Sequence, residues 1–238
     1  MPVYKRILLK LSGEALAGEQ GFGIVPEAIQ PICAEIKSVH DAGVQIAFVI
    51  GGGNIFRGIK ASEKGIDRVP ADYMGMLATI INGLAFQDVL EKMGMSTRLI
   101  SPISIIELSE PFVYRKIIKY LEDGIIVIFA GGTGNPFFST DTGASLRAAQ
   151  IKAEIIVKGT KVDGVYESDP VKNPDAKMYD KITFNEVLEK GLKVMDATAI
   201  AMCRDNKIPV SVYNLSQKGA LLKIINGEPV GTIVKENL

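Results

Sequence analysis

The sequence predicts an α/β protein built on a mostly parallel sheet. Strand-like and helix-like segments alternate along its 238 residues, which is the order expected when helices connect parallel strands. Several strand candidates are apolar at consecutive positions, as strands buried on both faces are. Four of them end in polar or glycine-rich sequence, which is where open parallel sheets bind ligands.

Six short apolar runs are predicted as strands, and six other segments are predicted as helices. The strands are residues 7–11, 45–50, 97–100, 125–130, 155–157 and 210–213. The helices are residues 26–42, 73–93, 142–152, 183–189, 197–206 and 219–225. The first helix carries Ile29, Ile32 and Ile36 on one face and has Gly43 as its stop. Residues 171–175 form the clearest loop.

Polar residues before three of these helices are candidate N-caps. Asp72 precedes the helix predicted at 73–93, and Asp196 precedes the helix predicted at 197–206. Thr140 or Asp141 can cap the helix predicted at 142–152.

Length and composition narrow the possible functions. The length suits one large domain, so we expect residues 1–238 to form a single domain. The 27 Lys and Arg residues equal the 27 Asp and Glu residues, and nucleic-acid binding is therefore not expected. Cys33 and Cys203 lie far apart without metal-ligand spacing, which favours a reduced, cytoplasmic protein. The chain shows no signal peptide and no apolar run near the roughly 20 residues of a membrane span, so no membrane partner is expected.

A long loop rich in glycine and hydroxyl side chains follows the strand predicted at 125–130. Residues 131–141 read Gly-Gly-Thr-Gly-Asn-Pro-Phe-Phe-Ser-Thr-Asp. Glycines let backbone N–H groups approach a phosphate, and Thr133, Ser139 and Thr140 add hydroxyl donors. The loop is longer than an ordinary strand-to-helix connection. It is therefore a candidate nucleotide-binding loop.

Three further loops follow strand ends and are expected at the same edge of the sheet. They are residues 10–14, 51–58 and 158–166. Lys10 interrupts an apolar strand, and a lysine is almost never buried without a partner. We expect Lys10 to lie at the strand end and to reach an anion.

Several common catalytic motifs are absent from the sequence. It contains no G-x-x-x-x-G-K-[ST], and residues 51–58 do not spell G-x-G-x-x-G, which disfavours P-loop and Rossmann sites. The motifs H-R-D, D-F-G, G-x-S-x-G and H-E-x-x-H are absent as well. The single histidine, His40, is predicted near the end of the first helix and not as a general base.

In their order along the chain, these motifs resemble the amino acid kinase superfamily and, within it, the bacterial uridylate (UMP) kinases. The resemblance spans essentially the whole chain. The matching segments are residues 10–14, 51–58, 72–79, 132–141, 160–166 with Asp169-Pro170, and 194–196. Lys-Leu-Ser-Gly and the triple glycine are shared across the superfamily, whereas Gly-Thr-Gly-Asn-Pro-Phe-Phe and Asp-Tyr-Met-Gly-Met-Leu-Ala-Thr are specific to the UMP-phosphorylating branch.

This resemblance implies a fold and a reaction. The fold is a three-layer αβα sandwich around a mostly parallel central sheet. The reaction transfers the ATP γ-phosphoryl group to UMP, giving UDP and ADP in pyrimidine nucleotide biosynthesis. The N-terminal part is expected to bind mainly the acceptor, and the part from about residue 155 mainly ATP. Mg²⁺ is expected to bind through the nucleotide phosphates with no metal ligand set on the protein, and the resemblance suggests a homohexamer, activation by GTP and inhibition by UTP.

The resemblance also assigns residues. For ATP they are Lys10, Leu11, Ser12, Gly13, Gly53, Arg57, Thr160, Tyr166 and Asp169. For UMP they are Gly52, Asp72, Thr133, Gly134, Asn135, Pro136, Phe137, Phe138, Ser139 and Thr140. The catalytic candidates are Lys10, Arg57, Asp141 and Asp169, with Asp196 as a further candidate for organising lysines and magnesium. The GTP segment is Gly18, Glu19, Gln20, Gly21, Phe22 and Gly23, in which Gln20 replaces a charge often found there.

The chemistry agrees with this set of residues. A phosphate acceptor has its second pKa near about 6, so it is already ionised at neutral pH and needs no strong base. Phosphoryl transfer depends instead on positioning and on cations, which Lys10 and Arg57 supply.

Other interpretations stay open at this point. Asp163-Gly164 and Asp169-Pro170 have turn composition, and Asp72 and Asp196 can act as caps alone. The same fold can phosphorylate a carboxylate or carbamate, or bind nucleotides for storage or sensing without turnover. The Asn-Pro-Phe-Phe sequence at 135–138 argues against the first alternative. The presence of Lys10, Arg57 and Asp169 argues against the second.

Overall fold

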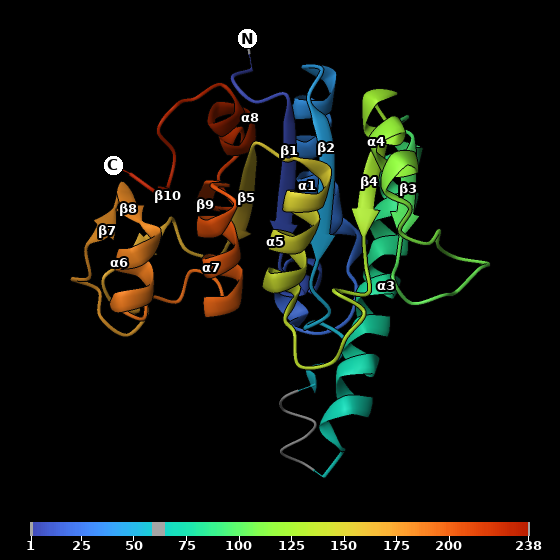
Figure 1. The fold of residues 1–238 in the computed structure, drawn as a ribbon, viewed down its shortest axis with the longest axis horizontal. Coiled ribbons are helices and arrows are strands. Elements are labelled where there is room, and N and C mark those ends of the chain that lie inside the picture. Colours follow the sequence, from blue (N-terminus) through green and yellow to red (C-terminus); the bar gives the residue numbers. More distant parts are fainter. Residues whose placement is uncertain (1, 59–64, 238) are drawn as a thin grey trace.

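The computed structural model describes residues 2–58 and 65–237, and an eight-stranded sheet forms its centre (Figure 1). The strand order is β3-β4-β2-β1-β5-β9-β10-β8. Neighbouring strands from β3 to β9 are parallel, and β10 is antiparallel to β9. The strands are β1 (Arg6–Leu11), β2 (Gln45–Ile50), β3 (Thr97–Ile100), β4 (Ile126–Phe129), β5 (Ile155–Thr160), β8 (Lys181–Thr183), β9 (Val210–Asn214) and β10 (Thr232–Lys235). The predicted α/β class with a mostly parallel sheet is confirmed.

Helices cover both faces of the sheet and make the predicted three layers (Figure 1). On one face pack α1 (Pro26–Asp41), α3 (Arg68–Lys92) and α8 (Ala220–Ile225). On the other pack α4 (Tyr114–Glu122), α5 (Thr140–Ile151), α6 (Phe184–Glu189) and α7 (Ala197–Asp205). Two 3₁₀ turns, Gly13–Leu16 and Gly18–Gln20, follow β1, and β6 (Val165–Tyr166) pairs with β7 (Met178–Tyr179) as a small hairpin. No helix in the described ranges is long and apolar enough to cross a membrane.

The central strand β1 shows why the apolar runs fold as they do. Leu8 belongs to the core beneath α5 and α7, whereas Ile7 and Leu9 belong to the core beneath α1 and α3. All three side chains are fully buried. Because successive strand residues point to opposite faces, a strand covered on both sides needs an uninterrupted apolar run.

The start of α3 differs from the prediction. The helix begins at Arg68, five residues before the predicted start, and Asp67 occupies its N-cap position. Asp72 therefore lies in the second turn, and its interpretation as the N-cap is wrong. Pro70 belongs to the first turn, where a proline is tolerated because the missing N–H has no intrahelical partner there.

Two further helix starts bear on the candidate site. Ser139 is the N-cap of α5, because its Oγ accepts from the backbone N–H groups of Asp141 at 3.0 Å and Thr142 at 3.1 Å. The predicted caps Thr140 and Asp141 instead form the first turn of the helix. The cap predicted at Asp196 is confirmed, since its Oδ1 accepts from Ala199 N at 2.9 Å.

Several short elements were not predicted, because their sequences show only weak hydrophobic periodicity. α4 has nine residues, of which Ile117 and Leu121 are buried, and its N-cap residue Val113 offers no capping side chain. The strands β6, β7, β8 and β10 have two to four residues each and lie partly exposed. Such short segments carry too few apolar positions to establish a period.

The parallel strands all end at one edge of the sheet, and the N-terminal half of α3 extends beyond that edge (Figure 1). The loops after β1, β2, β4 and β5 therefore come together there, as predicted for a ligand site.

Candidate functional site

A cavity of about 650 Å³ lies at the carboxyl edge of the sheet, between the loops after β2 and β4 and the start of α3. Its lining comprises Gly52, Gly53, Phe56, Arg57, Gly58, Arg68, Asp72, Gly75, Met76, Thr79, Gly132, Thr133, Phe137, Phe138, Ser139, Thr140, Thr142, Asp196, Ala197 and Thr198. We call it the first cavity. Its volume falls in the usual range of small-molecule sites.

A second cavity of about 430 Å³ lies beyond β5 and is rich in lysine. Its lining comprises Lys158, Thr160, Val162, Gly164, Val165, Tyr166, Glu167, Ser168, Asp169, Pro170, Lys172, Lys190, Gly191, Leu192, Lys193, Val194 and Val212. Four of these side chains are lysines, so an anionic ligand suits this cavity better than a neutral one.

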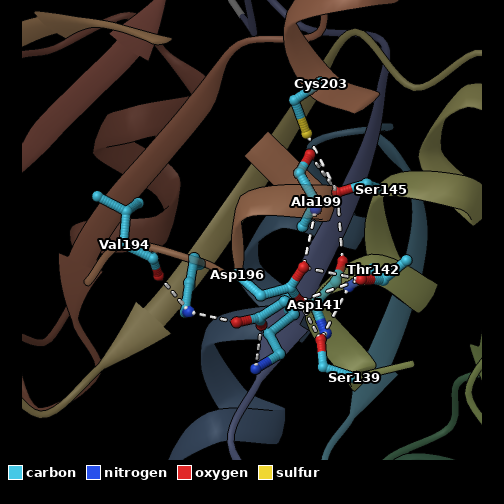
Figure 2. A network of polar contacts seen from close by, with 10 residues as sticks. Ser139, Asp141, Thr142, Ser145, Val194, Asp196, Ala199 and Cys203 are labelled. Carbon is cyan, nitrogen blue, oxygen red and sulfur yellow. Dashed lines mark hydrogen bonds and ion pairs between the residues drawn. The ribbon is translucent and has the colours of Figure 1, made fainter. Parts of the chain in front are cut away.

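Lys10, Asp141 and Lys158 form a charged cluster next to the two cavities. Lys158 lines the second cavity, and the chain neighbours of Asp141, Thr140 and Thr142, line the first. Lys10 and Lys158 are register partners in the adjacent parallel strands β1 and β5. Asp141, in the first turn of α5, reaches both of them: its Oδ1 lies 2.5 Å from Lys10 Nζ and its Oδ2 lies 3.0 Å from Lys158 Nζ. Lys158 Nζ also donates to Val194 O at 2.5 Å. Figure 2 labels Asp141 and Val194, the two partners of this ammonium group. The expectation that Lys10 reaches an anion is met by Asp141.

The electrostatics of this cluster keep the Asp141 carboxylate charged. Burial favours a raised pKa for Asp141, but attraction to Lys10 and Lys158 outweighs it and leaves the pKa below its ordinary value. Burial lowers the pKa of Lys158, and Asp141 opposes that shift. With all three groups charged, one carboxylate faces two ammonium groups, and the cluster keeps an excess positive charge that a phosphate could neutralise.

Asp196 joins two helices on the same side of the site (Figure 2). Besides capping α7, its carboxylate accepts from Thr142 Oγ1 at 2.9 and 3.1 Å and from Ser139 Oγ. One step further into the protein, Ser145 Oγ donates to Ala199 O at 3.2 Å and contacts Cys203 Sγ. The start of α5, which carries Asp141, is thus fixed to the start of α7.

The glycine loop after β2 lies directly against the helix α3. A Cβ on Gly52 would come within 2.7 Å of the Gly75 oxygen, so a larger residue would push the loop away from the helix. The buried side chain of Asn82, which belongs to α3, donates to Gly51 O at 2.7 Å and holds the start of the loop against this helix. Arg57, at the end of this loop, forms an ion pair with Glu14 from the loop after β1.

The loop after β4 is held to the same helix. Gly131 N donates to Thr79 Oγ1 at 2.7 Å, and Phe137 N donates to Asp72 Oδ2 at 2.7 Å. Phe137 has a φ of 70°, a value that residues other than glycine seldom adopt. Two turns of α3 thus determine where this loop lies over the first cavity.

The structure brings together most of the residues that the sequence assigned to binding. Nine line the first cavity, namely Gly52, Gly53, Arg57, Asp72, Thr133, Phe137, Phe138, Ser139 and Thr140. Three line the second, namely Thr160, Tyr166 and Asp169.

Other predicted residues lie outside both linings, as far as the described residues show. They are Lys10, Leu11, Ser12, Gly13, Asp141, Gly134, Asn135, Pro136 and the segment of residues 18–23. Leu11 is fully buried, and Asn135 bonds locally with Thr133. Within the 18–23 segment, Gly23 exchanges two hydrogen bonds with Asn54, which ties it to the glycine loop.

Sequence reasoning missed two charged residues of the site. Lys158 lies within β5 directly after the apolar residues 155–157, as Lys10 lies within β1 directly after residues 7–9, so the same argument could have found it. Arg68 belongs to no recognised motif. Its place in the cavity wall follows from the start of α3, which the sequence did not predict correctly.

Comparison with known proteins agrees with this architecture. A model described as the amino acid kinase family matches residues 5–214. A crystal structure of a UMP kinase from Bacillus anthracis matches with a TM-score of 0.96 at 41% sequence identity, covering 100% of this chain and 98% of that one. A UMP kinase from Ureaplasma parvum matches with a TM-score of 0.91 at 40% identity, covering 98% of this chain and 99% of that one.

A match at lower sequence identity also extends over nearly the whole of both chains. The uridylate kinase from Archaeoglobus fulgidus has a TM-score of 0.75 at 27% identity, covering 98% of this chain and 100% of that one. The family model spans β1 to β9 and includes both cavities and the charged cluster. The chain belongs to the amino acid kinase family.

Proposed function

We propose that this protein is a UMP kinase, which transfers the γ-phosphoryl group of ATP to UMP to give UDP and ADP. The observation that carries the proposal is the pair of cavities associated with the Lys10–Asp141–Lys158 cluster. Two ligand sites and a shared set of cations match the needs of a reaction between two nucleotides. The likeness to two UMP kinases at 40% identity or above supports the choice of acceptor.

The first cavity is assigned to UMP. Its uracil and phosphate would lie against the loop after β4, where Thr133 and Thr140 offer hydroxyl groups. Ser139 lines the same cavity, with its hydroxyl engaged by Asp196 and by the first turn of α5. Asp72 is assigned to the ribose, because a carboxylate accepts hydrogen bonds from hydroxyl groups. Gly134, Asn135 and Pro136 shape this loop from outside the lining.

The second cavity is assigned to ATP. Thr160, Tyr166 and Asp169 would surround the adenine nucleotide, and Lys158 lies where the cavity meets the charged cluster. Lys10 and Leu11 at the end of β1, and Ser12 and Gly13 directly after it, are assigned to the ATP side as well. On this assignment the whole chain is one domain, with the acceptor bound mainly by its N-terminal part and ATP mainly by the part from about residue 155.

The reaction requires alignment and charge neutralisation. The bond between the γ-phosphorus and the bridging oxygen of ATP breaks, a bond to a phosphate oxygen of UMP forms, and ADP leaves with the bridging oxygen. Lys10, Lys158 and Arg57 supply positive charge for the equatorial oxygens during transfer. Because the UMP phosphate is already ionised near neutral pH, no general base is needed.

Mg²⁺ fits this site mainly as a partner of the nucleotides. Both Asp141 oxygens face lysines, and the Asp196 carboxylate already accepts from Ser139, Thr142 and Ala199. Among the described residues no three acidic, histidine or cysteine side chains gather as a ligand set. Mg²⁺ commonly binds through substrate phosphates and one or two carboxylates. When bound, it would supply further neutralisation of the phosphate charges.

The wider role follows the same proposal. We place the enzyme in the cytoplasm and in pyrimidine nucleotide biosynthesis, with GTP as an activator that binds near residues 18–23 and UTP as an inhibitor. We further propose a homohexamer. An exposed apolar stripe on α3, formed by Tyr73, Leu77 and Ile81, offers a surface for subunit contact.

A coupled ADP-release assay tests the function directly. The purified protein with ATP and Mg²⁺ is offered UMP, CMP, glutamate, aspartate and carbamate in turn. We expect the highest rate with UMP. No rate with any acceptor would favour a nucleotide-binding protein without turnover, and a faster rate with an amino acid or carbamate would contradict the proposed acceptor.

A further inference from the structure

Arg68, Asp72 and Phe137 form a contact set at the mouth of the first cavity. Arg68 Nε lies 2.9 Å from Asp72 Oδ1 and 2.8 Å from Asp72 Oδ2. The Arg68 guanidinium carbon lies 5.2 Å from the centre of the Phe137 ring, within the range of a cation–π contact. The Phe137 amide donates to the same Asp72 carboxylate. Two segments of the cavity wall, the start of α3 and the loop after β4, therefore meet at one carboxylate.

Helix stability does not explain why an arginine stands at this position. Arg68 is the first residue of α3, where the partial positive charge of the helix end disfavours a cation. In its pair with Asp72 the cation precedes the anion by four residues, which is the less favourable order for such a pair. The placement is better explained by the carboxylate and the loop that the arginine holds.

The remaining capacity of Asp72 matters for its proposed contact with the ribose. An ionised carboxylate offers about four acceptor positions. Among the described residues, the single Nε–H of Arg68 is shared between Oδ1 and Oδ2, and the Phe137 amide adds a second donor to Oδ2, so Oδ1 accepts fewer hydrogen bonds there than Oδ2 does. The Asp72 side chain is 12% exposed, and it lines the cavity. Arg68 thus fixes the orientation of the carboxylate and, with it, the direction in which Oδ1 points.

We propose that Arg68 is a positioning residue that holds Asp72 and the Phe137 loop in place, and that it thereby determines the preference for ribose over deoxyribose in the acceptor. This inference rests on the proposed function, because it assumes that UMP occupies the first cavity. A 2′-hydroxyl is a donor that dUMP lacks, so a well-oriented acceptor on Asp72 discriminates between the two nucleotides. Without Arg68, the carboxylate can rotate and the loop loses its cation–π contact.

The test compares UMP with dUMP in four proteins: the wild type, Arg68→Gln, Asp72→Asn and the double variant. In R68Q we expect the ratio of kcat/KM for UMP over dUMP to fall at least fivefold. The fall should come from a higher KM for UMP, with kcat within threefold of the wild type and KM for ATP unchanged. In the D72N background, R68Q should leave the ratio unchanged, because Arg68 acts through Asp72.

A matched control exists at the other end of the same helix. Asp88 and Lys92 have the same spacing, with Lys92 Nζ 2.6 Å from Asp88 Oδ2, and both side chains are exposed. Lys92→Gln removes one cation from α3 as R68Q does, and it should leave the ratio and both KM values unchanged. Thermal melting of R68Q and K92Q shows whether both fold alike.

The outcomes separate the inference from the proposed function. A wild type that does not phosphorylate UMP overturns both. If the wild type is active on UMP and R68Q keeps the wild-type ratio, the inference alone is overturned. The inference alone is also overturned if kcat/KM falls by the same factor for UMP and dUMP in R68Q. A change in the ratio when R68Q is added to the D72N background likewise overturns the inference but leaves the proposed function standing.

Discussion

Asp141 is the carboxylate that keeps two lysines of the site close together. It lies 2.5 Å from Lys10 and 3.0 Å from Lys158, with 16% of its side chain exposed. Removing one partner from a buried ion pair leaves the other charge without compensation, which typically costs about 3–5 kcal/mol. Here two lysines would be left facing each other, so Asp141 is important for stability as well as for the proposed chemistry.

The first prediction concerns Asp141→Asn and pH. The pKa of Asp141 is lowered in the folded protein, so its charged form stabilises the fold above the unfolded value of about 3.9, and this contribution is lost as pH falls through the folded pKa. At pH 7, urea unfolding should show D141N less stable by about 3 kcal/mol. The difference from the wild type should stay constant down to about pH 5 and shrink below about pH 4. A difference that grows as pH falls would contradict this account.

The second prediction concerns the cations. Lys10→Ala and Arg57→Ala should each lower kcat with ATP and UMP by about 10²–10³-fold, because each removes a positive charge aimed at the transferring group. Lys37→Ala serves as the control, since Lys37 pairs with Asp41 on the exposed side of α1. Steady-state kinetics measure all three. Near-normal turnover in both K10A and R57A would refute the roles assigned to these residues.

At the scale of elements, α5 and α7 depend on a shared acid, Asp196. It caps α7 and accepts from Ser139 and Thr142 at the start of α5. Because α5 also carries Asp141, the orientation of the charged cluster depends on how these two helices meet.

The third prediction separates this role from ordinary capping. Asp196→Ala should lower stability by about 1 kcal/mol or more through loss of the cap, and it should also lower activity at least tenfold. Thr183→Ala removes the cap of α6, which forms a capping box with Glu186 outside both cavity linings in the described chain. T183A should lose a similar stability in thermal melts and keep its activity. Equal activity in the two variants would mean that Asp196 acts as a cap alone.

Elements with strong local patterns could be predicted from the sequence, and those with weak patterns could not. β1, β2 and β5 each contain at least three consecutive apolar residues, as strands buried on both faces do, and their order already indicated a parallel sheet. α4 and β10 depend on tertiary packing, because each buries two residues. The start of α3 was misplaced, since Pro70 and the polar residues before it resemble a loop.

The candidate site was predictable where a residue broke the pattern of its own strand. Lys10 did so, and its partner proved to be Asp141, a residue 131 positions away in the chain. Arg68 gave no such signal, because an arginine in a polar stretch is ordinary until its neighbours in space are known. Pairings such as Arg68 with Phe137 arise from the fold, and sequence spacing does not contain them.

At the scale of the whole molecule, α3 extends past the sheet edge (Figure 1). The helix also exposes several apolar side chains. Tyr73, Leu77 and Ile81 follow one another at four-residue spacing and are 42%, 43% and 48% exposed. Side chains at this spacing share one helix face. An exposed apolar face of this kind is typical of protein-contact surfaces, which is why we propose it for subunit contact.

The fourth prediction follows for assembly. Light scattering coupled to gel filtration should give about six times the chain mass of 25.7 kDa for the wild type. Leu77→Asp should yield smaller particles, because it places a charge in the apolar face. Val171→Asp is the control: Val171 is 82% exposed in a surface loop, and the mass should not change. A hexamer that survives L77D would show that this face does not join subunits.

The central claim is that two nucleotides bind on either side of the Lys10–Asp141–Lys158 cluster. A crystal structure with UMP and a non-hydrolysable ATP analogue tests it most directly. We expect UMP in the first cavity with its ribose at Asp72, and the analogue in the second cavity with its terminal phosphate between Lys10 and Lys158. UMP in the second cavity, or both nucleotides away from these lysines, would contradict the account.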